Sequence, residues 1–210
     1  MVLTEELLSY LATSIHGSTS VNFQGKKINL SAPFKRLTFQ CAIKEKLGVD
    51  IHNYKELFDK AKQLGLEPQE NISTGKLIMD LYDKAIEPTL IEPTFMIDHP
   101  WETSPLAKKK EGNSAVVERF ELIINGMEIA NAFTELNDPV DQEERFKEQQ
   151  EAKKTGDDEA HPMDNDFIEA LKYGMPPAGG LGIGIDRIVM LLTDSASIRD
   201  VLFFPHMKDK

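Results

Sequence analysis

The sequence contains one cysteine, Cys41, among its 210 residues. A single thiol cannot form a disulfide within the chain, and it cannot build a zinc site that depends on several cysteine ligands. The five histidines are scattered, and no two of them have the HxxxH spacing that places two imidazoles on one face of a helix. The sequence therefore gives no indication of a disulfide framework or of a metal site made of cysteine or histidine.

The chain also has no apolar run near the roughly 18 residues that a membrane-spanning helix requires. It has no basic, signal-like start, and we therefore expect a cytoplasmic protein. The formal net charge is −11 at pH 7, so the surface as a whole does not favour nucleic acid, although a local basic patch or another domain could still bind RNA. The length and the 40% hydrophobic composition predict one globular domain, or a large part of one.

The most informative segment is ERFELIINGMEIANAFTELND, residues 118–138. Its two runs of β-strand composition, Arg119–Ile124 and Met127–Phe133, flank Asn125-Gly126. Asn-Gly between apolar runs is the strongest short hairpin signal, because both turn residues need a positive φ. The segment therefore predicts a β-hairpin with a two-residue turn.

Two carboxylates lie on one face of this predicted hairpin. In a regular two-residue hairpin Glu121 faces Ala130 and Glu128 faces Ile123, which makes the two glutamates diagonal neighbours roughly 7–8 Å apart. Such a pair could hold Mg²⁺ between the protein and a polyphosphate. The alternative interpretation is a half-buried sheet with a solvated acidic face, and the spacing leaves both open.

Asn131, Phe133 and Glu135 follow at intervals of two residues. In a regular strand they share one face, opposite to Glu128. For all of these residues to serve one pocket, a β-bulge near Ile129–Ala130 must turn the chain, as bulges beside active sites often do. We therefore predict a bulge at this position.

The rest of the chain reads as scaffold, because apolar residues recur at helical spacing or alternate in short runs bounded by glycine or proline. We expect an N-terminal helix with Thr4 as its N-cap. The other expected elements are a hairpin of Ser20–Phe23 and Lys27–Leu30, helices over Thr38–Leu47, Tyr54–Leu64 and from Thr74, a strand over Pro93–Asp98, and helices from Asp138 to about Lys153 and over Asp166–Tyr173.

Two charged runs are each open to two interpretations. The run Lys108-Lys109-Lys110 could meet phosphates or form a solvated loop tip. The run Asp157-Asp158-Glu159 could bind a cation or form a charge cluster at a helix end.

Glycines alternate along a predicted strand near the C-terminus, at Gly180, Gly182 and Gly184. A base or sugar could lie against such bare backbone. Arg187 follows where a helix begins, so its guanidinium and the helix N-terminus could both favour phosphate. The spacing matches neither the dinucleotide-binding fingerprint nor a P-loop. The alternative interpretation is a strand packed tightly under a helix, with Arg187 paired to a carboxylate.

The segment GLGIGIDR, residues 180–187, resembles the third signature motif of class II aminoacyl-tRNA synthetases. Residues 118–138 resemble the segment that precedes this motif in lysyl-tRNA synthetases. The resemblance runs from about Leu3 to Met207 and includes further matching segments: Pro93-Thr94-Phe95, Ser104–Ala107, Phe133–Asn137, Gly156–Ala160, Pro176-Pro177 and Ile198–Pro205.

The resemblance implies a role for each candidate residue. It places Arg187 at the γ-phosphate of ATP, Glu121 and Glu128 at Mg²⁺ beside the phosphates, and the backbone of Gly182 and Gly184 along the adenosine. It assigns the lysine pocket to Asn131, Phe133 and Glu135. The last assignment also has a physical reason, because a lysine ammonium that loses its water needs a carboxylate.

The implied fold is α+β, with a mostly antiparallel sheet flanked by helices. The implied function is that of a lysine–tRNA ligase, a cytoplasmic homodimer that uses ATP and Mg²⁺ to activate L-lysine to lysyl-adenylate and transfers it to tRNA(Lys). Residues 1–210 would be the C-terminal portion of the catalytic domain, without the first two signature motifs and the anticodon-binding domain. The second motif supplies an arginine for the α-phosphate, so we expect the isolated chain to be weakly active or inactive.

Two other interpretations stay open on the sequence. One is a shortened synthetase paralogue that attaches lysine or a related amino acid to a protein. The other is a non-catalytic nucleotide-binding or interaction module that keeps the fold and has lost the chemistry. The charged candidates Glu121, Glu128, Glu135 and Arg187 are all present, which argues against the second of these.

Overall fold

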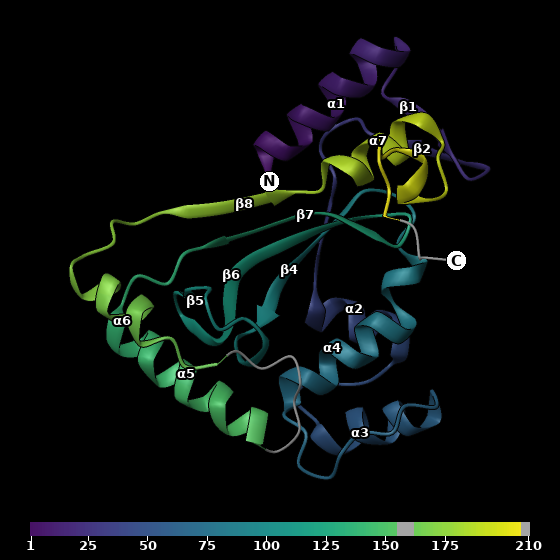
Figure 1. Ribbon diagram of the computed structural model, residues 1–210. Helices are drawn as coiled ribbons and strands as arrows, with labels where there is room; N and C mark the ends of the chain where they lie inside the picture. The colour runs from purple at the N-terminus through teal and green to yellow at the C-terminus, as the bar shows by residue number, and fades with distance from the viewer. Residues whose placement is uncertain (155–161, 207–210) are drawn as a thin grey trace.

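The computed structural model describes residues 1–154 and 162–206, with a six-stranded sheet at its centre (Figure 1). The strands lie in the order β3-β4-β6-β7-β8, and β5 pairs beside β6. Of the strand pairs in the described residues, only β3 and β4 run parallel. The strands are β3 Lys35–Thr38, β4 Thr94–Pro100, β5 Lys109–Lys110, β6 Asn113–Ile124, β7 Met127–Thr134 and β8 Gly179–Ile183.

Helices surround the sheet, which confirms the predicted α+β class (Figure 1). In this view α1 lies above the sheet, α2–α4 lie below it on the right, and α5 with α6 lie below it on the left. No helix in the described residues is long and apolar enough to cross a membrane. The helices are α1 Val2–His16, α2 Phe39–Leu47, α3 Tyr54–Gln63, α4 Thr74–Ala85, α5 Pro139–Lys154, α6 Asn165–Lys172 and α7 Ile185–Thr193, with short 3₁₀ turns η1 Glu87–Thr89, η2 Trp101–Thr103 and η3 Ile198–Asp200.

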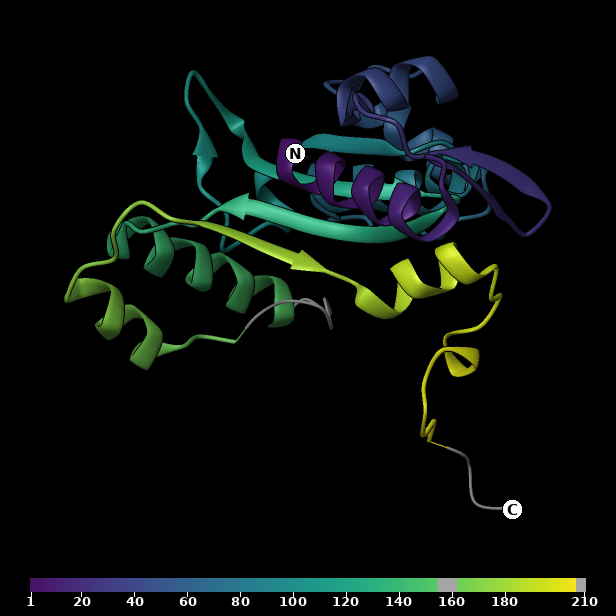
Figure 2. The same cartoon turned by 90° about the horizontal axis from the view of Figure 1, so that it is seen from above.

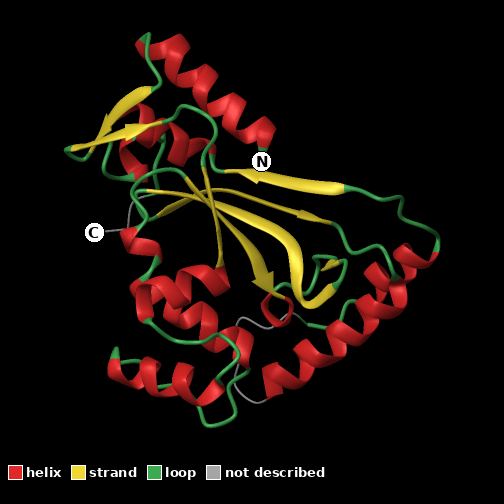
Figure 3. Ribbon diagram, turned by 180° about the vertical axis from the view of Figure 1, so that it is seen from behind, coloured by secondary structure: helices red, strands yellow, loops and turns green. Residues whose placement is uncertain are grey.

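A separate two-stranded hairpin, β1 Ser20–Phe23 with β2 Lys26–Asn29, lies beside α7, as the rear view shows (Figure 3). Seen from above, the chain beyond α7 leaves the sheet and runs away from it toward the C-terminus (Figure 2). The hairpin and the helices α2, α3, α4, α5 and α6 follow the predicted segments within one or two residues.

One expectation about the N-terminal part was wrong, and one strand there was missed. Thr4 is not an N-cap, because α1 already begins at Val2 and Thr4 is buried in its first turn. The strand β3 was not predicted, since only Leu37 of its four residues is buried and so short a run carries no alternation signal. Its pairing with β4, which is distant in sequence, makes it a strand. Thr38 ends this strand and caps α2, accepting a hydrogen bond from the backbone of Cys41.

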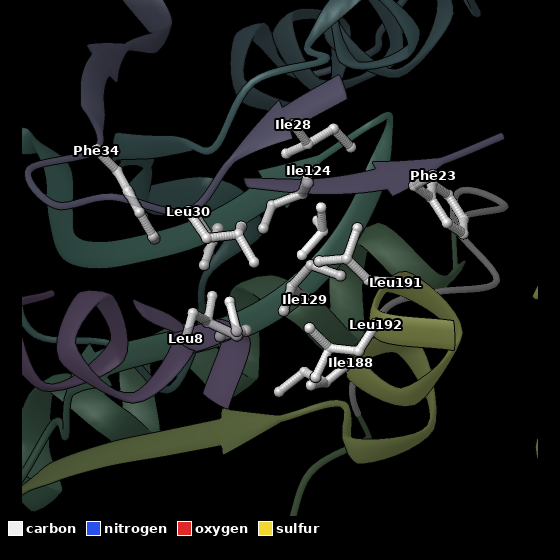
Figure 4. Close-up of a cluster of buried hydrophobic side chains, with 14 of the residues drawn as sticks. Leu8, Phe23, Ile28, Leu30, Phe34, Ile124, Ile129, Ile188, Leu191 and Leu192 are labelled. Carbon is white, nitrogen blue, oxygen red and sulfur yellow. The ribbon is translucent and has the colours of Figure 1, made fainter. Parts of the chain in front are cut away.

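The sheet separates two hydrophobic cores. On one face, side chains from α1, the β1–β2 hairpin and α7 pack together, as Leu8, Ile28 and Leu191 show (Figure 4). The same cluster contains Leu122 of β6 and Phe95 of β4. On the other face, α2, α3 and α4 cover Met96 and Ile123. Neighbouring residues of β6 and β4 therefore serve opposite cores, as the two-residue period of a strand requires. Because both faces of the sheet are buried here, the end of β6 next to the hairpin turn is held in place. The candidate site extends along the hairpin from this end.

Candidate functional site

The β6–β7 hairpin turns at Asn125-Gly126, with positive φ at both residues as predicted. Next to the turn Ile123 pairs with Glu128, but further along Leu122 pairs with Ala130. Ile129, which lies between Glu128 and Ala130, is therefore an additional residue on β7 and forms a β-bulge. The predicted bulge is confirmed.

The bulge shifts the pairing by one residue, so the predicted pairing of Glu121 with Ala130 was wrong. Glu121 pairs with Asn131 instead. Paired residues of antiparallel strands point to the same face, and so do residues two apart on one strand. One face of the sheet therefore carries Glu121, Asn131 and Phe133. Glu128 is on the same face, because its partner Ile123 lies two residues from Glu121 on β6. The bulge is what brings the two predicted groups, carboxylates and pocket residues, to one side.

Glu135 lies just beyond the end of β7 and continues the same alternation. Its backbone N–H donates to the carbonyl oxygen of Ala178 at 3.0 Å, and it forms a β-bridge with Ala107. These contacts fix the backbone of Glu135 between Ala178 and Ala107. Among the described residues its carboxylate makes no side-chain hydrogen bond and no ion pair.

The alternating glycines lie opposite this row. Gly182 pairs with Asn131, and Gly180 pairs with Phe133. Gly184 follows the strand as the N-cap of α7, and its N–H donates to the carbonyl of Ile129 at 2.9 Å. This contact ties the start of α7 to the bulge.

A pocket of about 300 Å³ lies between β7, β8 and the start of α7, and we call it the β7–α7 pocket. Its lining includes Glu128, Asn131, Gly182, Gly184 and Arg187. The residues predicted to contact the phosphates, the metal and the adenosine therefore lie around this pocket, with one exception. Glu121 lies next to the pocket, because it pairs with Asn131. Glu135 lies outside this pocket, beyond the end of β7.

Arg187 lies in the first turn of α7 and points to the bulge. Its guanidinium donates to the carbonyl oxygen of Glu128 at 2.5 Å and lies 3.9 Å from the Glu128 carboxylate. The pairing with a carboxylate that the alternative interpretation expected is therefore present. The side chain is still 46% exposed, and a guanidinium has five N–H donors, so donors remain for a phosphate.

Arg119, which the sequence reasoning did not assign to the site, connects its parts. It donates to Glu121 at 2.6 Å, to Asn131 at 3.2 Å and to the hydroxyl of Ser104 at 2.9 Å. The only available signal was its position two residues before Glu121, on the same face of one strand. The buried His99 was also missed, and its Nε2 lies 3.5 Å from the other carboxylate oxygen of Glu121.

These contacts set the charges of the site. Burial works to raise the pKa of Glu121, but the neighbouring His99 ring and the Arg119 guanidinium outweigh it and hold this pKa below its ordinary value. Burial, followed by the negative charge of Glu121, raises the pKa of Glu128. Burial also lowers the pKa of His99 below its ordinary value. Glu121 is thus a stable anion, and Glu128 is close enough to be affected by it.

A cation would relieve this repulsion. The described residues contain no group of three or more histidine, cysteine or acidic side chains placed to hold a metal. Mg²⁺, however, is commonly bound by one or two carboxylates together with substrate phosphates and water. The pair Glu121 and Glu128 fits this mode of binding, in which a polyphosphate completes the coordination. The arrangement does not fit a metal cage made by the protein alone.

The predicted charged runs contribute little here. Lys109 lies over the ring of Trp101 at 4.7 Å and 3.7 Å from Asp141, and Lys110 pairs with Asp98 at 2.7 Å. The two lysines therefore dock β5 onto its neighbours rather than forming a purely solvated tip. The run Asp157-Asp158-Glu159 and the matching segment Gly156–Ala160 lie outside the described residues.

Comparison with known proteins agrees with this geometry. A family model described as tRNA synthetases class II (D, K and N) matches residues 1–208. The chain is 53% identical to a lysine–tRNA ligase of Thermoanaerobacter sp. (strain X514), 51% to one of Staphylococcus epidermidis and 50% to one of Moorella thermoacetica. Each match covers all of this chain and 43–44% of the relative, so the chain spans less than half the length of these curated relatives. The chain therefore belongs to the class II tRNA synthetases of the D, K and N group.

Proposed function

We propose that this chain is the C-terminal portion of the catalytic domain of a lysine–tRNA ligase, which activates L-lysine with ATP and transfers it to tRNA(Lys). The observation that carries the proposal is the bulge at Ile129, because it puts Glu121, Glu128, Asn131 and Phe133 on one face, with Glu135 next in line. The identity of about 50% to lysine–tRNA ligases supports the choice of substrate.

The phosphate end of the proposed site consists of Glu121, Glu128 and Arg187 around the β7–α7 pocket. The lysine carboxylate oxygen attacks the α-phosphorus of ATP, and the bond from this phosphorus to the bridging oxygen of pyrophosphate breaks. The products are lysyl-adenylate and pyrophosphate. Arg187 would neutralise negative charge on the γ-phosphate, and the two glutamates would hold Mg²⁺ against the phosphates. Positioning and charge neutralisation then supply most of the acceleration.

The lysine end consists of Asn131, Phe133 and Glu135. The side chain of the substrate would lie along the half-buried ring of Phe133, and its ammonium would meet the Glu135 carboxylate. A site for an acidic amino acid would need a cation in this place. The cation on the neighbouring strand is Arg119, which pairs with Phe133. Its guanidinium already donates to Glu121, Asn131 and Ser104.

The remaining properties belong to the proposed longer protein. The relatives have more than half of their length outside the matched region. We propose that this part supplies the first two signature motifs and the anticodon-binding domain, and that the whole protein is a cytoplasmic homodimer. No specific observation favours a paralogue acting on protein or a non-catalytic module.

The intact mass of the native protein and lysine-dependent ATP–pyrophosphate exchange test this proposal together. We expect a mass several tens of kilodaltons above the 23.6 kDa of this chain and exchange that requires lysine and Mg²⁺. The isolated chain should exchange weakly or not at all. Native protein of the higher mass that shows no lysine-dependent exchange would contradict the proposed function, and robust exchange by the isolated chain would contradict its assignment as a portion.

A further inference from the structure

Gly180 lies directly against the carboxylate of Glu135. A Cβ atom built on Gly180 would lie 2.2 Å from Oε1 of Glu135 and 3.4 Å from its Cδ, whereas real Cβ atoms essentially never come within 3.0 Å of a heavy atom of another, non-adjacent residue. The carboxylate therefore occupies a space that exists only because residue 180 has no side chain. We call this space the Gly180 slot.

The strand pairing explains this contact. Gly180 pairs with Phe133, so any side chain at position 180 would stand on the same face as Phe133 and Glu135. Glu135 is the diagonal neighbour of Gly180 across the strands. Its backbone is fixed on one side by the hydrogen bond to Ala178 and on the other by the bridge to Ala107. With the backbone held, the position of the carboxylate depends on the space that Gly180 leaves.

Backbone conformation does not explain a glycine here. Gly180 does not have the positive φ that seven other glycines of the described residues adopt. A glycine inside a strand weakens the strand and often marks a place where another group approaches closely. Here the group that approaches is the carboxylate of Glu135.

We propose that Gly180 is a positioning residue for lysine specificity, because it leaves the slot from which Glu135 meets the substrate ammonium. This inference rests on the function proposed above. A methyl group at position 180 would push Oε1 from 2.2 Å to the ordinary contact distance of 3.4 Å or more, a displacement of about 1 Å. Charge-assisted hydrogen bonds are short and directional, so a displaced carboxylate meets the ammonium poorly.

The test is Gly180→Ala in the protein at its native length, with lysine-dependent ATP–pyrophosphate exchange as the assay. We expect the KM for lysine to rise at least about tenfold, while the KM for ATP stays within twofold. The thermal midpoint should not fall, because alanine suits a strand better than glycine. This split between the two KM values separates a displaced carboxylate from a damaged fold.

The neighbouring residue gives a matched control. A Cβ atom on Gly179 would lie 3.9 Å from the carbonyl oxygen of Phe133, which is an ordinary contact, and Gly179 pairs with Thr134 on the opposite face. Gly179→Ala should therefore leave the KM for lysine unchanged. A rise equal to that of Gly180→Ala would overturn the inference.

Shortening the carboxylate tests whether Gly180 acts through Glu135. In Glu135→Asp the side chain is one methylene shorter and does not reach the slot, so adding Gly180→Ala should change the KM for lysine less than twofold. The inference is overturned if Gly180→Ala has no effect on this KM, or if it has its full effect in the Glu135→Asp background. An inactive wild type at native length would instead overturn the proposed function, and this inference with it.

Discussion

The two ends of the candidate site differ in how their charges are compensated. At the phosphate end each glutamate has an arginine nearby: Arg119 donates to Glu121 at 2.6 Å, and Arg187 lies 3.9 Å from Glu128. At the lysine end Glu135 has no such partner among the described residues. At one end the carboxylates thus have guanidinium neighbours within the chain, and at the other the carboxylate is left for a ligand to pair with.

This difference matches what each end would bind. ATP with Mg²⁺ brings both negative and positive charge. On binding, the carboxylates of the site can pair with Mg²⁺ and the guanidiniums with the phosphates, in place of their pairing with each other. A lysine side chain brings a single positive charge, and an unpaired carboxylate is its complement. The same contrast explains why the phosphate end contains several charged groups and the lysine end only one.

The largest expected effect is that of Arg187→Ala at the phosphate end. Removing this guanidinium takes away positive charge that the proposed transition state requires, so we expect ATP–pyrophosphate exchange to fall about 100- to 1000-fold. Arg199→Ala is the control, because Arg199 lies exposed in η3 and outside the β7–α7 pocket. Exchange rates within twofold of wild type for Arg187→Ala would show that this end does not bind the phosphates.

A smaller effect is expected for Glu121→Gln. The substitution keeps the shape of the side chain but removes the negative charge that would bind Mg²⁺, so the Mg²⁺ concentration for half-maximal exchange should rise about 10- to 100-fold. Glu118→Gln is the control on the same strand, since Glu118 is exposed and faces the opposite side of the sheet. An unchanged Mg²⁺ requirement in Glu121→Gln would remove Glu121 from the proposed metal site.

The smallest effect concerns stability and arises from Glu87 in η1. Burial and the charges of Asp83, Glu121 and Glu128 raise the pKa of Glu87 from 4.5 to about 7. The folded chain therefore holds this proton more tightly than the unfolded chain, and the stability from this group is lost as the pH rises from about 4.5 through about 7. We expect Glu87→Gln to raise the thermal midpoint by a few degrees near pH 8 and to change it little near pH 5.

Thermal unfolding followed by circular dichroism at both pH values measures this difference. Glu92→Gln serves as a comparison, because Glu92 follows η1 closely and its carboxylate already accepts a hydrogen bond from the backbone of Asn29. The same gain for Glu87→Gln at both pH values would mean that repulsion among the carboxylates is not the cause.

Local sequence was enough to predict the framework of the site. The turn Asn125-Gly126 specified the hairpin, and the requirement that Glu128 and Asn131 share a face specified the bulge. Alternating glycines followed by Arg187 predicted the strand and helix that close the β7–α7 pocket. Each of these features depends on residues close together in the chain.

The contacts that tune the site could not be predicted in this way. The Arg119 guanidinium reaches Ser104, His99 comes from β4, and Gly180 makes room for a side chain 45 positions earlier. These contacts depend on strand order and on side-chain conformation. The strand β3 was missed for the same reason, since its partner Thr94–Ile97 lies far along the chain.

The most direct test of the central claim, that Glu135 recognises the side-chain ammonium of the substrate, compares lysine with norleucine. Norleucine has the same four side-chain carbons and lacks the amine. In ATP–pyrophosphate exchange by the protein at native length, Glu135→Gln should reduce the preference for lysine over norleucine by about 10- to 100-fold, because it removes a charge-assisted hydrogen bond. An unchanged preference would contradict the account, since the ammonium would then be recognised by another group.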